Sequence, residues 1–169
     1  SLSSTISGMK KLMQEGKIKE IGVSNFSLNR WLKAEKILNG NVVTNQVEFN
    51  LLHPQAIVNM NPQLQNNHVM IAYSPLAMGL LSGKYDNVRK PTNDRLKNPA
   101  FSSRNFNNVE RVMQVVRRIA ISHGSSISQI ALAWVISHPN VIAIPGAKSP
   151  EQVRENAAAA DIALTESEF

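Results

Sequence analysis

The sequence predicts an α/β protein in which short parallel strands alternate with amphipathic helices. Hydrophobic residues recur at helical spacing in several segments, short apolar runs lie between them, and glycine or proline separates most of them. Strands that alternate with helices form parallel sheets with right-handed crossovers. The chain has 169 residues, of which 43% are hydrophobic, so we expect a single compact domain over residues 1–169.

The N-terminal residues predict a helix followed by a short strand. The helix begins after the capping candidates Ser4 and Thr5, and Gly16 stands where a helix ends in a residue free to adopt positive φ. Residues 18–23 alternate apolar and polar before becoming apolar, which is typical of a strand. We expect this strand to end at the polar triplet 24–26.

The next segment predicts a second helix and a strand with unusual contents. The helix follows a serine cap and stops at an Asn-Gly pair, covering residues 28–39. Residues 42–49 read as a strand that contains Asn45, Gln46 and Glu48. Because polar groups in a core strand are costly to bury alone, these side chains are expected to have bonding partners or to face a pocket.

The middle of the chain carries weaker signals. Residues 55–67 are only weakly helical because Pro62 interrupts them, whereas residues 69–73 form a short apolar strand. From residue 77 to residue 107 there is little periodicity, and glycine, proline and asparagine recur. This predicts a long loop, and loops of this length inside a compact domain are usually functional or mobile.

The C-terminal part returns to clear periodicity. One amphipathic helix is predicted over residues 109–124, and the next, 127–136, is apolar nearly all round and should be buried on more than one side. A last strand covers 141–144, and Ser-Pro-Glu at 149–151 gives a final helix its cap, N1 proline and acidic first turn. Such strands form either an open doubly wound sheet or half of an eight-stranded barrel, and periodicity does not choose between them.

The charge pattern argues against nucleic acid as a partner. The net charge of +6 comes from 18 Lys and Arg against 12 Asp and Glu, and the basic residues are scattered along the chain. Only 5% of residues are aromatic, and they do not interleave with the basic ones as single-strand binders require. The pattern is typical of a solvated surface, and it also favours a small anionic ligand through long-range attraction.

Cysteine content and hydropathy favour a cytoplasmic protein. Cysteine is absent, which removes disulfides and thiolate metal sites and fits a reducing compartment. No apolar run approaches the roughly 20 residues of a membrane span, and the serine-rich start lacks the order of a signal peptide. The four histidines are too scattered for a local zinc motif. We therefore expect neither a membrane nor a metal as partner.

Polar side chains stand at the carboxyl ends of the predicted strands, where parallel α/β folds have their sites. The groups are Ser24 with Asn25, Asn45 with Gln46, Tyr73 with Ser74, and the run 146–149. Amides and hydroxyls there are able to bind a carboxamide, and a tyrosine ring offers a flat face to an aromatic ring. Lys148 and Ser149, directly before a helix N-terminus, suit a phosphate. The set therefore predicts a nucleotide site.

Each of these residues also has a structural interpretation. Ser149 would then cap its helix, Lys148 would be solvated, and Asn45 and Gln46 would bond to the backbone. For any one residue this interpretation is favoured, whereas for the whole set the nucleotide is. Competing motifs are absent: the sequence contains no G-x-G-x-x-G, no phosphate loop ending in Gly-Lys-Ser/Thr and no G-x-S-x-G.

Five segments resemble consecutive signatures of the aldo-keto reductase family, in family order and across essentially the whole chain. They are GKIKEIGVSNF at 16–26, NQVEFN at 45–50, IAYSPLAMGLLSGKY at 71–85, ALAW at 131–134 and IPGAKSPEQVREN at 144–156. That family folds as a (β/α)8 TIM barrel and reduces aldehydes and ketones by hydride transfer from NADPH. The resemblance implies that residues 1–169 are the C-terminal half of such a barrel, covering about strands five to eight.

The resemblance also implies roles at the nicotinamide and pyrophosphate of the cofactor. Ser24, Asn25 and Gln46 would hold the nicotinamide carboxamide, and Tyr73 would stack on its ring. Residues of the next turn would run beside the pyrophosphate, namely Ser74, Leu76, Gly79 and Leu81.

A third group resembles the adenosine end of the family's site. Its members are Gly146, Lys148, Ser149, Gln152, Glu155 and Asn156. Lys148 and Ser149 would meet the 2′-phosphate, and Glu155 and Asn156 match positions near the adenine. Gln152 falls where many members have an arginine, with Arg154 two residues later, so the resemblance alone does not fix a preference for NADPH over NADH.

The residues that perform the family's chemistry are not expected in this chain. In the family a tyrosine protonates the carbonyl oxygen, supported by a lysine, an aspartate and a histidine, and all four belong to the first half of the barrel. Tyr73 and Tyr85 match cofactor and loop positions, so neither is a candidate catalytic acid. Without a general acid, turnover falls by roughly 10²-fold or more, and we expect the chain alone to be inactive.

A half barrel also predicts partners, because its first and last strands expose unpaired edges. We expect either the N-terminal half of the same barrel or self-association, together with a small carbonyl substrate. The main rival is a non-catalytic nucleotide-binding or regulatory subunit, since the family includes channel-associated members. A third alternative is an α/β domain without a ligand.

Overall fold

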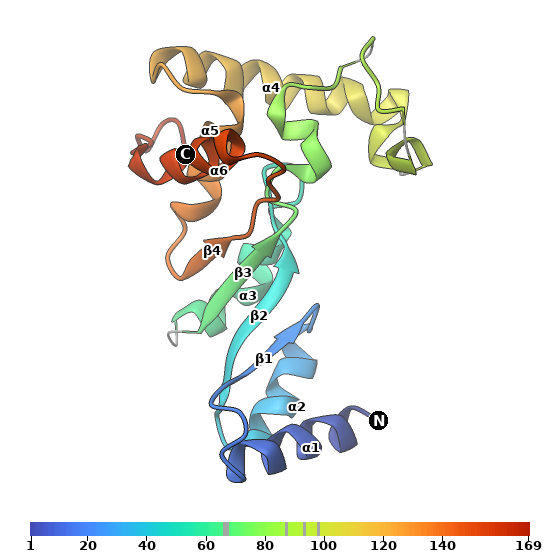
Figure 1. Ribbon diagram of the computed structural model, residues 1–169, viewed down its shortest axis with the longest axis vertical. Coiled ribbons are helices and arrows are strands. Elements are labelled where there is room, and N and C mark those ends of the chain that lie inside the picture. Colours follow the sequence, from blue (N-terminus) through green and yellow to red (C-terminus); the bar gives the residue numbers. More distant parts are fainter. Residues whose placement is uncertain (66–67, 87, 93, 98) are drawn as a thin grey trace.

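A computed structural model of the chain describes residues 1–65, 68–86, 88–92, 94–97 and 99–169. It contains a parallel sheet of four strands in the order β1-β2-β3-β4 (Figure 1). The strands are β1 Ile21–Ser24, β2 Val42–Glu48, β3 Val69–Tyr73 and β4 Val141–Ala143. All four predicted strands are therefore confirmed, although β1 begins three residues later than expected, at Ile21 instead of residue 18.

Helical segments connect the strands and extend the molecule at both ends of the sheet. The α-helices are α1 Leu2–Gln14, α2 Leu28–Leu38, α3 Gln55–Gln65, α4 Ser103–Ser122, α5 Ile127–Ile136 and α6 Pro150–Ala157. The 3-10 segments are η1 Ala77–Ser82, η2 Asp94–Lys97, η3 Pro99–Phe101 and η4 Ala158–Asp161. Figure 1 shows the sheet through the middle of an elongated molecule, with α1 and α2 at one end and α4, α5 and α6 at the other.

Two predictions about the earlier helices are wrong. The cap of α1 is Ser1, whose hydroxyl accepts a hydrogen bond from the Ser4 backbone N–H at 3.3 Å, so Ser4 and Thr5 lie inside the helix. The helix α3 continues past Pro62 to Gln65 instead of being interrupted. A proline inside a helix removes one backbone hydrogen-bond donor, and α3 remains helical on both sides of this position.

The segment 77–107 is more helical than its sequence predicts. The segments η1, η2 and η3 occupy much of it, and α4 begins at Ser103 instead of residue 109. Four of its large side chains are at most 2% exposed: Leu80, Leu81, Phe101 and Phe106. These residues come from several short turns, so their spacing follows no single period. A core cluster lies where the sequence predicts a loop.

Helix α5 is packed on several sides, as predicted. The side chains of Ile130, Ala131, Leu132, Ala133 and Val135 are all at most 2% exposed. This burial explains why its sequence is apolar nearly all round. In the described part of the chain no single helix meets the length and hydropathy of a membrane span, and only α4 and α5 taken together, with a bend of 97°, satisfy that test.

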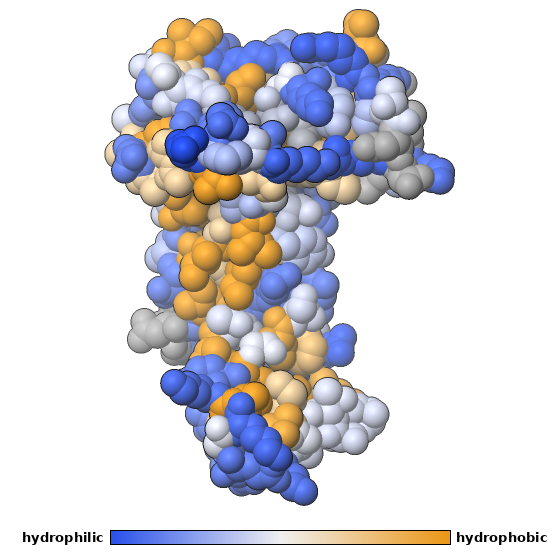
Figure 2. Space-filling view, in the orientation of Figure 1, coloured by the Kyte–Doolittle hydropathy of each residue, from blue (hydrophilic) through white to orange (hydrophobic). Residues whose placement is uncertain are grey.

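The helices that pack on the sheet cover one of its faces. On β3, Met70 and Ala72 lie on the covered face and are fully buried, whereas Ile71 points to the opposite side. On that opposite side, which we call the inner face, Ile142 and Ile144 are 54% and 44% exposed. Figure 2 shows hydrophobic residues gathered over the strands in the middle of the molecule. One-sided cover and sequential strand order favour half of an eight-stranded barrel, because a doubly wound sheet has helices on both faces.

Candidate functional site

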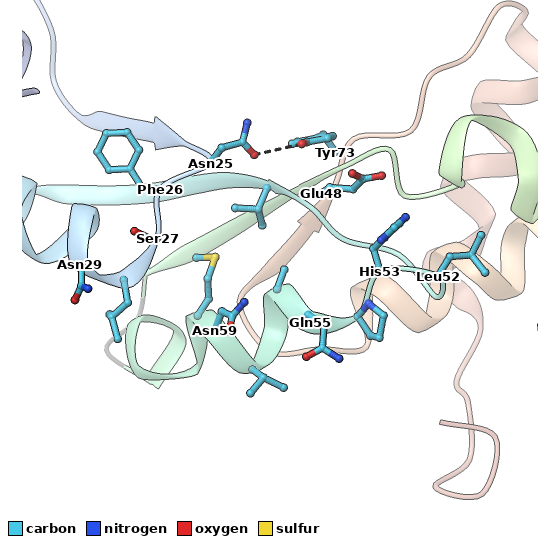
Figure 3. A pocket seen from close by; sticks show the side chains of 16 residues that line it. Asn25, Phe26, Ser27, Asn29, Glu48, Leu52, His53, Gln55, Asn59 and Tyr73 are labelled. Carbon is cyan, nitrogen blue, oxygen red and sulfur yellow. Dashed lines mark hydrogen bonds between the residues drawn. The ribbon is translucent and has the colours of Figure 1, made fainter. Parts of the chain in front are cut away.

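The structure brings Ser24, Asn25, Gln46 and Tyr73 together at the carboxyl ends of β1, β2 and β3. The backbone carbonyl of Gln46 accepts hydrogen bonds from the Ser24 hydroxyl at 3.0 Å and from the Asn25 N–H at 2.8 Å. The hydroxyl of Tyr73 donates to Asn25 Oδ1 at 3.2 Å, a bond drawn in Figure 3. The predicted residues of the nicotinamide end are therefore neighbours.

Asn25 lies in a backbone conformation that few residues adopt. Its φ is 55°, in the left-handed region where asparagine is enriched among non-glycine residues. The next residue, Phe26, is held by the side chain of Asn45, which is 1% exposed. Asn45 Nδ2 donates to the Phe26 carbonyl at 2.9 Å, and its Oδ1 accepts from the Phe26 N–H at 3.3 Å. For Asn45, the structural interpretation that the sequence left open is therefore the observed one.

A run of left-handed residues follows β3. Ser74, Ala77 and Met78 have φ values of 50°, 47° and 56°, and Gly79 follows at 99°. Non-glycine residues in this region store strain and cluster at functional sites. The Leu76 carbonyl closes the turn by accepting from the backbone N–H groups of residues 79 and 81 at 2.8 and 3.2 Å.

Two further residues at this turn, Asn50 and Leu81, are fully buried. Asn50, which is fully buried, donates through Nδ2 to the Ser74 carbonyl at 3.0 Å and so anchors the start of the turn. Leu81 is also fully buried, so in this structure it offers no accessible surface to a ligand.

The start of α6 forms a second group of predicted residues. Ser149 Oγ accepts from the Gln152 N–H at 3.3 Å, and Gln152 Oε1 accepts from the Lys148 N–H at 2.7 Å. Ser149 therefore caps the helix, as its structural interpretation predicts, while the side chain of Lys148 is exposed. The backbone N–H of Glu151 itself and the Ser149 hydroxyl lower the pKa of the Glu151 carboxyl. Gly146 lies exposed in the segment that links β4 to this group.

Glu155 and Asn156, predicted near the adenine, line different clefts. Glu155 Oε1 accepts from the Ser126 hydroxyl at 2.6 Å, at a cleft of about 510 Å³ between α4, α5 and α6. Asn156 lines a cleft of about 340 Å³ with Leu132 and Pro145. The contacts of Glu155 thus tie α6 to the capping box of α5, in which Ser126 is the cap.

Asn25 and Tyr73 help to line a cleft of about 980 Å³, whose other lining residues come mostly from the start of α2, the segment after β2 and α3. Figure 3 shows Asn25, Tyr73 and Glu48 near one another, with side chains of α3 on the other side of the strands. Glu48 is the register partner of Tyr73, and His53 also lines the cleft. In the sequence, Glu48 stands out only as a polar residue in a strand with no assigned role, and nothing singles out His53.

These groups are suited to binding a planar amide and a phosphate. Amide and hydroxyl groups at the ends of the strands are suited to a planar amide, and an exposed ammonium group beside a helix start is suited to a phosphate. Within the described residues, no three His, Asp or Glu side chains gather as metal ligands would. Fold and site together define a parallel barrel segment whose polar groups lie at the carboxyl ends of its strands.

Comparison with known proteins identifies the family. The model of the aldo/keto reductase family matches residues 1–169, and the chain therefore belongs to this family. It is 47% identical over 159 residues to an uncharacterized oxidoreductase of Mycobacterium tuberculosis, a match that covers 94% of this chain and 49% of that protein. It is 32% identical over 167 residues to the methylglyoxal reductase YeaE of Escherichia coli, covering 98% of this chain and 50% of that one.

Solved structures agree with this assignment. The glycerol dehydrogenase of Gluconobacter oxydans superposes with a TM-score of 0.89 at 30% identity, over 99% of this chain and 51% of that one. An aldo-keto reductase from Klebsiella pneumoniae in complex with NADPH gives a TM-score of 0.71 at 33% identity, over 99% and 51%. The chain spans about half the length of the relatives it matches. The expectation of a half TIM barrel is confirmed.

Proposed function

We propose that this chain is the cofactor-binding half of an NADPH-dependent aldo-keto reductase that reduces aldehydes or ketones. The observation that carries the proposal is the junction of Asn25, Gln46 and Tyr73 at the carboxyl ends of three neighbouring strands. Names of relatives support a carbonyl substrate, since two Escherichia coli relatives are methylglyoxal reductases, one of them NADH-specific. A Klebsiella pneumoniae relative was crystallised with NADP and acetate.

The donor set fits a nicotinamide at this junction. Tyr73 is only half-buried, so part of its ring is open to stacking, and the Asn25 side chain is exposed beside it. Ser24 and Gln46 are the remaining candidates for the carboxamide. When bound, the reduced nicotinamide supplies the hydride. The role of this chain is to bind and orient the ring.

The phosphates and adenosine would lie along two further segments. The turn through Ser74, Leu76, Gly79 and Leu81 would run beside the pyrophosphate, although the N–H groups of Gly79 and Leu81 already bond to the Leu76 carbonyl. The adenosine group would comprise Gly146, Lys148, Ser149, Gln152, Glu155 and Asn156. Lys148 brings the cation for a 2′-phosphate, while Gln152 already bonds to the Lys148 N–H. NADPH is therefore the proposed cofactor, with NADH as the alternative.

The proton donor and the rest of the substrate pocket would come from a second half. The half-exposed Ile142 and Ile144 on the inner face, and the outer edges of β1 and β4, form a surface suited to further strands. We propose the N-terminal half of the barrel as the partner, with self-association as the alternative. We also propose that the protein acts in the cytoplasm.

Fluorescence titration with NADPH tests the proposal. The chain should bind NADPH saturably, yet oxidise it no faster than buffer when an aldehyde is added, because the catalytic tyrosine and its supporting residues would come from the other half of the barrel. Absence of saturable binding would refute the proposal. Binding without turnover in a protein that contains both barrel halves would instead favour a regulatory nucleotide-binding subunit.

A further inference from the structure

We propose that the hydroxyl of Tyr73 is a positioning group that orients the Asn25 amide toward the carbonyl oxygen of the nicotinamide carboxamide. This inference rests on the proposed function, and it adds to the stacking role of the Tyr73 ring. Its basis is the bond of 3.2 Å in which the hydroxyl donates to Asn25 Oδ1. That bond occupies the acceptor atom of the amide and leaves its NH2 group for a ligand.

The backbone of Asn25 is fixed, but its side-chain amide is not fixed by the backbone. The Asn25 N–H bonds to the Gln46 carbonyl, and the Asn45 side chain holds the next residue, Phe26, on both sides. The terminal torsion of an asparagine has a broad, roughly two-fold profile, so a half turn exchanges its donor and acceptor. In the structure the Tyr73 hydroxyl donates to Oδ1 of the exposed Asn25 amide, and this contact turns the NH2 group away from Tyr73.

Ser24 provides a hydrogen-bond acceptor beside the donor of Asn25. Its hydroxyl proton is committed to the Gln46 carbonyl at 3.0 Å, so the exposed oxygen of Ser24 is left to accept. Asn25 therefore presents a donor and Ser24 an acceptor at the same strand ends. A carboxamide, with one carbonyl oxygen and one NH2 group, matches this pair, whereas a carboxylate, which has no donor, does not.

A double-mutant cycle tests whether Tyr73 acts through Asn25. Tyr73→Phe keeps the ring and should weaken NADPH binding about two- to tenfold, the value of one hydrogen bond. Binding of adenosine 2′,5′-bisphosphate, which has no nicotinamide, should stay unchanged. Asn25→Gly removes the amide and tolerates the positive φ, and in that background Tyr73→Phe should have no further effect. Tyr85→Phe is the matched control, since its hydroxyl bonds to Arg95 outside this junction.

The outcomes separate this inference from the proposed function. If the wild-type chain does not bind NADPH saturably, the proposed function fails and the inference fails with it. If wild type binds but Tyr73→Phe binds NADPH equally well, or if the effects of the two substitutions simply add, the positioning role is overturned alone. The assigned polarity can also be tested on the wild-type chain. An NADP+ analogue in which a carboxylate replaces the carboxamide of the nicotinamide ring should bind about tenfold more weakly than NADP+. Equal binding of the two would contradict the assigned polarity.

Discussion

The buried amide of Asn45 bonds to both backbone polar groups of Phe26, the residue that follows Asn25. The same device recurs on the next loop, where the fully buried Asn50 bonds to the Ser74 carbonyl. Asn45 lies in β2, and Asn50 lies two residues after its end. The polar residues of this part of the chain thus hold two loops that carry proposed cofactor contacts.

Replacement of Asn45 should destabilise the protein and loosen the site. Asn45→Ala leaves the Phe26 N–H and carbonyl without their bonds, and the expected loss is about 2 kcal/mol of unfolding free energy. Urea unfolding measures the loss, and NADPH titration should show weaker binding. Asn108→Ala, at an exposed position of α4, is the matched control and should change stability by less than about 0.5 kcal/mol. Equal stability of the two variants would show that the Phe26 bonds contribute little.

Lys148 should determine how well the chain discriminates between the two nicotinamide cofactors. Lys148→Met keeps most of the side-chain length and removes the charge that would meet a 2′-phosphate. We expect NADPH affinity to fall about tenfold, near 1.4 kcal/mol, with NADH affinity unchanged. Lys36→Met, on the exposed side of α2, is the control for net charge. A parallel loss for NADH and NADPH would exclude a contact with the 2′-phosphate.

The contact between Glu168 and His123, at the end of α4, should weaken in acid. The Thr165 backbone N–H, then the His123 ring and the Thr165 hydroxyl, lower the pKa of Glu168 from 4.5 to about 2. A lowered carboxyl pKa stabilises the folded state above pH 4.5, and this contribution is lost as the pH falls through the folded value near 2. In Glu168→Gln the free energy of unfolding should therefore fall less steeply between pH 4.5 and about pH 2 than in the wild type. Denaturant unfolding at several pH values measures this slope. Glu166→Gln, at an exposed neighbouring position, should retain the wild-type slope.

Gly22 leaves room for Thr44 on the neighbouring strand. A Cβ at position 22 would overlap Thr44 Oγ1, so Gly22→Ala should cost about 1–3 kcal/mol of unfolding free energy. Adding Thr44→Ala removes the overlapping atom and should recover much of the loss. Failure of this rescue in thermal or urea unfolding would locate the cost in the β1 backbone instead.

Local signals predicted much of the fold. The strands were predicted by short apolar runs, and the start of α6 by the sequence Ser149-Pro150-Glu151, whose serine does cap the helix. These features depend on residues that are neighbours in the chain. The burial of α5 was predicted for the same reason, from an apolar character that needs no knowledge of its partners.

Features that depend on distant residues were not predicted. Phe101 and Phe106 are buried because they pack in one core cluster with the η1 segment, a relation that no local period encodes. The left-handed conformations of Ala77 and Met78 are equally unexpected, since neither residue type favours them. Motif resemblance pointed to Asn25 and Tyr73 separately, and only the fold revealed that they bond to each other.

Backbone NMR of the labelled chain during titration with NADP+ tests the central claim most directly. If one dinucleotide spans the strand ends and the start of α6, resonances of Asn25, Gln46, Tyr73 and Lys148 should shift together with a single binding constant. Shifts confined to one of these regions, different constants for the two regions, or no saturable shift at all would contradict the account.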